Sequence, residues 1–219
     1  MSDNIRQAHR HCERLVRAHD KDRYLASLFA PADRRPYLFA LYAFALELAR
    51  VKMLVKEPMA GAIRLQWWRE AIEGLRAEEA AANPVMSALQ DAARQTGVSL
   101  APLTAAVEAR EAELHGTPPI GAAATVFTMA ARLLGADGEA IAPAADLAGQ
   151  AVTLIETEPN QARAAYRAFR GIVGSQPEAA LPAFLPAALV PLRLQRPNAP
   201  QWRRQIVLLR TAWFGFPRI

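Results

Sequence analysis

The sequence predicts an all-α protein, a single-domain helical bundle of 219 residues. Hydrophobic residues make up 52% of the chain, and valine or isoleucine rarely alternates with polar residues at a period of two. Proline and glycine separate stretches whose apolar residues recur at helical spacing. A chain of this length buries a substantial core, and its one cysteine, Cys12, excludes a disulfide framework.

The other helices are expected to pack around the first half of a helical hairpin, residues 36–55. Its only charges are Glu47, Arg50 and Lys52, so we expect a helix buried on most of its circumference. Glu47 and Arg50 lie three residues apart and can pair, which stabilises two charges in an apolar interior. If that pair is buried, Glu47→Gln or Arg50→Ala is expected to cost about 3 kcal/mol of stability.

The second half of the hairpin follows a short loop. Pro58 and Gly61 are predicted to break the first helix. Helical spacing then resumes, and the residues expected on its apolar face are Ile63, Trp67 and Ile72.

An alternative interpretation of this hairpin is a ligand pocket in which Glu47, Arg50, Arg64 and Arg69 present charge. A magnesium–diphosphate clamp would need two acids one helical turn apart, because Mg²⁺ is bound through carboxylate oxygens. Glu47 has no acidic residue at positions 43, 44, 50 or 51. The hairpin therefore provides no magnesium site of that kind.

Two other groups of metal-binding residue types are interpreted as ordinary helix surface. His9, His11 and Cys12 cannot all face one ion on a helix, so we expect a solvated basic face there. Glu108 and Glu111 share a helix face, but their surroundings are typical of a solvated surface. No metal ligand and no cofactor is predicted.

The resemblance to a known family lies in three stretches, DRYLASLFAP, LYAFALELARVKMLVKEP and GAIRLQWWREAIEG. They resemble the squalene/phytoene synthase family, an all-α isoprenoid-synthase fold that condenses prenyl diphosphates head to head. ELARVK, the turn at Glu57 and Pro58, and RLQWW are similar to one branch of it. That branch contains the mitochondrial complex I assembly factor with a phytoene-synthase-like domain and its proteobacterial relatives. The resemblance is densest over residues 22–74.

The chain departs from the catalytic members at both of their aspartate-rich motifs. The positions that correspond to the first motif hold Ala49, Arg50 and Met53. The nearest counterpart of the second, GQAVTLIETEPN, offers Glu156 and Glu158, which point to different faces of a helix. The resemblance therefore implies a pseudoenzyme with no catalytic residue.

The second half of the chain is expected to be shorter than the family norm. A family segment of the type LLRALPFHAARGRLYLP has no counterpart, so helices that wall the prenyl cavity would be missing. The apolar sequence that follows is expected to form short pieces, because prolines interrupt it. These prolines are Pro177, Pro182, Pro186 and Pro191.

The resemblance also suggests where a ligand would bind. In the synthases the helix that corresponds to RYLASLFAP lines the substrate cavity, and here Asp20 and Asp22 are expected to begin it. The candidate pocket residues are Arg23, Tyr24, Glu47, Arg50, Arg64 and Trp67.

A basic, aromatic tail is expected from about residue 195 to residue 219. Such a segment can pack on the protein's own core, lie on a membrane surface or dock on a partner. The candidate contact residues are Trp202, Arg203, Arg204, Trp213, Phe214 and Phe216.

The charge and hydropathy patterns limit the function classes. The formal net charge of +5 permits attraction to an anionic surface, but no nucleic-acid-binding module is recognisable. No run reaches 18 apolar residues, and the charged N-terminus resembles neither a signal peptide nor a transit peptide. We expect a cytoplasmic protein that associates peripherally with the bacterial inner membrane.

Three functions stay open at this point. The resemblance favours a non-catalytic assembly factor or accessory subunit of respiratory complex I, acting by protein contact with its subunits or with another membrane-associated complex. The second is a module that binds a prenyl lipid or quinone, which a large apolar cavity would support and bulky side chains would count against. The third is a prenyl transferase that is active only with a paralogous subunit.

Overall fold

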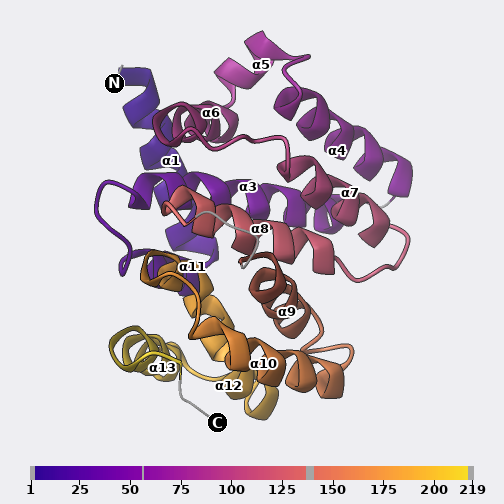
Figure 1. The fold of residues 1–219 in the computed structure, drawn as a ribbon. Helices are drawn as coiled ribbons and strands as arrows, with labels where there is room; N and C mark the ends of the chain where they lie inside the picture. Colours follow the sequence, from indigo (N-terminus) through magenta and orange to yellow (C-terminus); the bar gives the residue numbers. More distant parts are fainter. Residues whose placement is uncertain (1–2, 56, 137–140, 217–219) are drawn as a thin grey trace.

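The regular elements of the chain are helices arranged in one bundle (Figure 1). The computed structural model describes residues 3–55, 57–136 and 141–216, and within these ranges it contains no β-strand. The prediction of an all-α fold is therefore confirmed. The α-helices are α1 (Asp3–His19), α2 (Lys21–Ser27), α3 (Arg35–Leu54), α4 (Pro58–Ile72), α5 (Ala77–Ala82), α6 (Pro84–Thr96), α7 (Leu103–Glu113), α8 (Ile120–Leu133), α9 (Ile141–Thr153), α10 (Pro159–Val173), α11 (Leu181–Phe184), α12 (Val190–Gln195) and α13 (Gln201–Phe214), and the 3₁₀ helices are η1 (Glu178–Ala180) and η2 (Leu185–Leu189).

Helix α3 is the centre of the bundle. All residues from 38 to 45 are buried, which requires neighbours on every side of the helix. These neighbours include α1, α6 and α8, and Figure 1 shows α3 crossing the middle of the molecule with α8 in front of it. The predicted central helix is thus confirmed for its first half, whereas residues 52–54 at its end are exposed.

Helices α8 and α9 pack more closely than ordinary side chains allow. A Cβ atom added at Gly149 on α9 would lie 2.7 Å from the backbone nitrogen of Ala124 on α8. Small residues permit this approach, as expected from the alanine-rich sequence of α8.

Helix α4 begins earlier than predicted. Pro58 occupies its first turn, where the missing N–H of proline costs nothing. Gly61 does not interrupt the helix but lies buried within it. A Cβ atom added at Gly61 would lie 2.8 Å from Cδ1 of Leu114. The glycine leaves room for the side chain of Leu114, which follows the end of α7.

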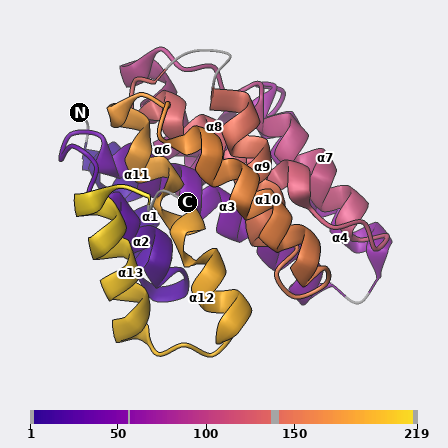
Figure 2. The same ribbon diagram turned by 60° about the horizontal axis from the view of Figure 1, so that its bottom comes forward.

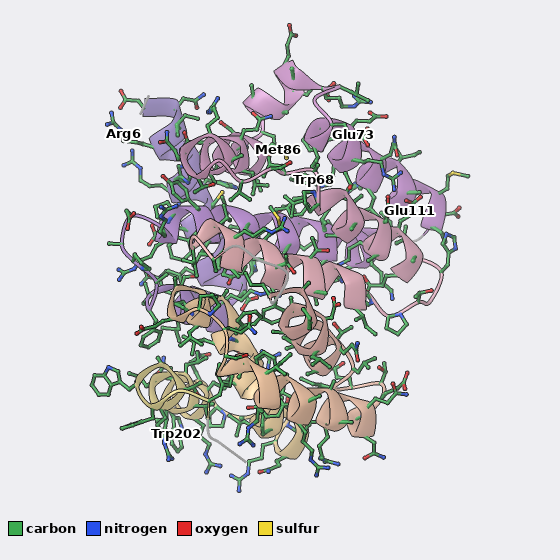
Figure 3. All side chains as sticks on the ribbon, in the orientation of Figure 1. Arg6, Trp68, Glu73, Met86, Glu111 and Trp202 are labelled. Carbon is green, nitrogen blue, oxygen red and sulfur yellow. The ribbon has the colours of Figure 1, made fainter. Side chains whose placement is uncertain are left out.

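The buried face of α4 also differs from the prediction. Leu65 and Trp68 are buried, whereas Ile63 is 66% exposed and Trp67 and Ile72 are half-buried. Trp68, labelled in Figure 3, packs edge-on against Phe44 of α3 at 5.3 Å between ring centroids. The contacts with α3 and α7, rather than the apolar spacing alone, determine which face points inward.

The N-terminal helix buries a residue that was expected to be solvated. His9 and Cys12 are both buried, and His9 Nε2 lies 2.9 Å from Asp91 Oδ2 on α6. The predicted solvated basic face is therefore wrong for these two residues. The partner of His9 lies 82 residues away in the sequence, so local spacing gave no sign of it.

The C-terminal part consists of short helical pieces followed by one longer helix. The prolines divide residues 178–195 into η1, α11, η2 and α12, as predicted. Helix α13 then packs on α2 and η2, where Leu208 meets Ala26, Leu185 and Leu189 (Figure 2). One face of the expected tail is thus part of the fold.

We expect Gly149→Ala to lower the free energy of unfolding by about 1–3 kcal/mol, because the methyl group would force α8 and α9 apart. Gly171→Ala on α10 is the matched control, since no heavy atom lies within 4 Å of an added Cβ there. The control should gain up to about 1 kcal/mol from the better helix propensity of alanine. Urea unfolding of both variants tests the prediction, and equal effects would contradict it.

We expect the stability to fall as the pH rises from 9 to 12. Burial raises the pKa of the Cys12 thiol from 9.0 to about 12, so only the unfolded state loses this proton over that range. Burial also raises the pKa of Tyr42, with the same sign of effect. Urea unfolding at increasing pH should show a shallower decline for Cys12→Ala, and an unchanged slope would disprove the contribution of the thiol.

Candidate functional site

A cavity of about 550 Å³ opens where α2, α7, α9 and α12 meet. Its volume is in the range of small-molecule sites. Its walls carry charges of both signs in equal number, and one aromatic ring, that of Phe127 on α8. The charged lining residues are Asp20, Asp22, Arg23, Lys52, Arg110, Glu113, Glu156 and Arg193.

The most deeply buried charge of the cavity is the carboxylate of Asp22, in the first turn of α2. Its Oδ2 accepts hydrogen bonds from Arg193 Nη2 of α12 at 2.8 Å and from Arg204 Nη1 of α13 at 2.7 Å. Only 5% of the Asp22 side chain is exposed, so these two cations are what make the buried charge tolerable. The cluster joins the beginning of the chain to helices 171 and 182 residues further on.

The neighbouring residues fix the start of α2. Asp20 caps the helix, since its Oδ1 accepts a hydrogen bond from the backbone N–H of Arg23 at 3.0 Å. Its Oδ2 lies 3.3 Å from the Arg23 guanidinium, which is held 5.4 Å from the ring centroid of Tyr42. Burial raises the pKa of Tyr42, so its phenol stays neutral beside this ion pair.

On the opposite wall, Glu113 at the end of α7 is also neutralised. Its carboxylate accepts a hydrogen bond from Arg110 at 2.7 Å and lies 3.7 Å from Lys52 Nζ of α3. The three charges join α7 to the end of α3, and each oxygen of this carboxylate lies within 4 Å of a basic side chain.

The cavity does not fit a divalent metal bound to a diphosphate. Mg²⁺ requires carboxylate oxygens that converge on one point, but Asp20, Asp22 and Glu113 are each engaged by arginine or lysine. Glu156 is exposed at the cavity edge. Among the described residues, no group of three or more His, Cys, Asp and Glu residues is placed to hold a metal ion.

The six predicted pocket residues do not lie in one pocket. Arg23 lines the cavity, whereas the other five do not. Tyr24 stacks on Phe39 at 5.5 Å and belongs to the core packing. Arg64 is exposed on α4.

Trp67 holds α5 against α4. Its Nε1–H donates to Glu79 Oε2 at 2.8 Å, and this hydrogen bond is the main reason why the pKa of Glu79 lies below its usual value.

The predicted pair of Glu47 and Arg50 forms, but it is not buried. The two side chains meet at 3.2 Å and are 33% and 42% exposed. The condition for the expected cost of about 3 kcal/mol is therefore not met, because a partly exposed pair is worth at most about 1 kcal/mol. Helix α3 is enclosed over its first half, and the pair lies on the second.

Two of the predicted contact residues make contacts within the protein instead of facing a partner. Arg204 is bound to Asp22, and Phe216 packs edge-on against Phe169 at 5.2 Å. These side chains point inward.

The other four predicted contact residues lie on the surface. Trp202 is 55% exposed, and Trp213 and Phe214 are exposed by 80% and 81%. The guanidinium of half-buried Arg203 lies 5.1 Å from the Trp202 ring centroid.

A second exposed apolar surface lies at the turn between α3 and α4. We call it the hairpin patch, and its side chains are all more than half exposed. Its residues are Met53, Leu54, Met59 and Ile63. Within the described ranges no helix is both long and apolar enough to cross a bilayer.

Sequence reasoning missed Asp22 and Arg193 as site residues. Asp22 was expected only to begin a helix, and Arg193 lay in a stretch divided by prolines. A faint signal was present, because Asp22 is four residues before Ala26 and so shares the buried face of α2.

The helical bundle has the isoprenoid-synthase-like fold. Residues 16–157 match the family model of squalene/phytoene synthase, and the chain belongs to this family. A crystal structure of a dehydrosqualene synthase in complex with a ligand superposes with a TM-score of 0.73 over 96% of this chain and 97% of that one. At 14% identity this likeness shows the fold alone. The expected shortening of the second half stays a prediction.

Curated relatives share part of the sequence. The chain is 36% identical over 104 residues to the human protein "NADH dehydrogenase (ubiquinone) complex I, assembly factor 6" and 34% identical over 105 residues to its Bos taurus counterpart. Each match covers 48% of this chain, but 31% of the human and 32% of the bovine protein. The matched part thus spans about a third of these relatives.

We expect Asp22→Asn to lower the free energy of unfolding by about 3 kcal/mol, because two arginines would lose their common counter-charge. Glu47→Gln is the matched control, and it should cost less than about 1 kcal/mol because its pair is partly exposed. Urea unfolding measures both, and similar losses would contradict the central role of Asp22.

Proposed function

We propose that this protein is a non-catalytic member of the squalene/phytoene synthase family that acts by protein contact, as an assembly factor or accessory subunit of respiratory complex I (NADH:quinone oxidoreductase). The names of the curated relatives support the partner. The observation that carries the non-catalytic role is the state of the cavity, where Asp22 and Glu113 are each engaged by two cations.

The loss of catalysis follows from the chemistry that a prenyl synthase needs. Ionisation of a prenyl diphosphate depends on Mg²⁺ ions held by carboxylates, which stabilise the departing negative charge. Here Ala49 and Arg50 stand where the resemblance places the first motif, and neither offers a carboxylate. Two of the carboxylates that line the cavity, those of Asp22 and Glu113, instead stabilise contacts between helices.

The cavity gives less support to a prenyl-lipid or quinone module. A prenyl chain needs an apolar wall, whereas this lining is dominated by ion pairs. Behind Phe127 the core is filled, because its ring stacks on Phe184 at 5.8 Å and Phe184 contacts Phe169 at 5.7 Å. Bulky aromatic side chains thus occupy part of the space that a buried chain would require.

The proposed role places the protein at the surface of the membrane that carries complex I. The exposed aromatic residues of α13 and the hairpin patch are apolar surfaces available for contact. We propose complex I subunits as the partners, with no role for nucleic acid.

Affinity purification of the tagged protein from solubilised membranes of its host should recover complex I subunits in fixed proportion, and mass spectrometry identifies them. An untagged strain is the control. Recovery of the protein alone, or with a second synthase-like chain, would contradict the contact role. Magnesium-dependent release of pyrophosphate from farnesyl or geranylgeranyl diphosphate by the purified protein would contradict the loss of catalysis.

A variant of a cavity residue tests in the living cell whether the protein acts by protein contact or through a reaction in the cavity. Glu156→Gln removes an exposed carboxylate near the position of the second family motif and should leave folding unchanged. In a deletion strain this variant should restore NADH:quinone oxidoreductase activity as well as the wild type does. Failure to restore it, with normal amounts of folded protein, would indicate a chemical role for the cavity.

A further inference from the structure

The outward face of α13 carries an apolar stripe that the fold does not use. Its residues are spaced by four, three and four positions, which places them on one side of a helix that turns about 100° per residue. The buried residues Leu208 and Thr211 lie on the opposite side. The α13 stripe consists of Trp202, Ile206, Leu209 and Trp213, all 46–80% exposed.

The inner face of α13 holds this stripe outward. The ion pair of Arg204 with Asp22 and the packing of Leu208 on Ala26 fix the helix against α2. In Figure 2 α13 lies at the edge of the molecule beside α2, and Figure 3 shows Trp202 at this periphery. The stripe is therefore a preformed surface.

The charge around the stripe is of one sign. From residue 179 to residue 219 the sequence contains six arginines and no aspartate or glutamate. Within α13, Arg203 contacts the Trp202 ring and Arg210 is exposed on the same side of the stripe. A surface that covers α13 would thus need to be both apolar and negatively charged.

We propose that α13 docks the protein on an anionic lipid bilayer, with the stripe at the level of the headgroups and Arg203 and Arg210 facing lipid phosphates. Tryptophan is suited to this interface because its ring is apolar and its N–H is polar. A helix with one apolar face and basic flanks lies in the plane of such a surface. This inference rests on the proposed role beside a membrane-bound complex and names the surface that would hold the protein there.

A second copy of the chain fits the stripe less well. Packing two α13 helices together would bring Arg203 and Arg210 of both copies close to one another, and the helix contains no acidic residue to neutralise them. Anionic headgroups provide the missing negative charge.

The test is co-sedimentation of the purified 219-residue chain with vesicles. We expect binding to vesicles that contain phosphatidylglycerol, weakening as salt is added, and little binding to pure phosphatidylcholine. Ile206→Asp with Leu209→Asp should reduce binding by about tenfold or more, since both side chains are exposed and the change opposes insertion. Arg203→Gln with Arg210→Gln should weaken binding and flatten its salt dependence.

The matched control is Met59→Asp with Ile63→Asp in the hairpin patch. It removes similar exposed apolar side chains and adds the same charge, but at a distant surface. This control should bind anionic vesicles as the wild type does. Circular dichroism verifies that each variant is folded.

Three results would overturn the proposal. These are no binding to anionic vesicles, equal losses in the stripe variant and the control, and a dimer in sedimentation analysis that the stripe variant dissociates. The last would assign the stripe to contact between copies. The vesicles contain no protein, so a failure to bind them would not decide whether complex I subunits are recovered with the protein. Likewise, a failure to recover those subunits would not decide whether α13 binds lipid.

Discussion

The buried carboxylate of Asp22 is the constraint on which the arrangement of the C-terminal helices depends. It receives arginines from α12 and α13, and it lies on α2, whose start is fixed by the Asp20 cap. Helices α2 and α12 border the cavity, and the contacts of Arg204 and Leu208 with α2 hold α13 so that its other face is exposed. The buried charge of Asp22 therefore supports both the polar lining of the cavity and the position of the exposed α13 stripe.

The cavity between α2, α7, α9 and α12 is lined by ion pairs. Carboxylates on its walls are partners of arginine and lysine, as Glu113 shows with Arg110 and Lys52. A fold shared at 14% identity with a dehydrosqualene synthase is compatible with this, because function depends on the residues of a site and not on the bundle that carries them. Here the ion pairs of Asp22 and Glu113 stabilise contacts between helices.

Local patterns in the sequence predicted the helices and the enclosed first half of α3, because apolar spacing and proline act over a few residues. The same reasoning failed where the partner is distant. His9 was predicted to be solvated, but it is paired with Asp91 of α6. The pair of Glu47 and Arg50 was predicted to be buried, but it lies beyond the enclosed first half of α3. Among the residues that line the cavity, the sequence indicated Arg23 but not Asp22 or Arg193. No spacing rule relates Asp22 and Arg193, because they lie 171 positions apart.

The distance along the chain between Asp22 and its arginines also has a consequence for biosynthesis. Arg193 leaves the ribosome 171 residues after Asp22, so the carboxylate stays hydrated while α3 to α10 are made. The early helices can collect around α3 during this time through contacts of shorter range. Closure of the cavity and orientation of α13 therefore come late in folding, after the helices around α3 have been made.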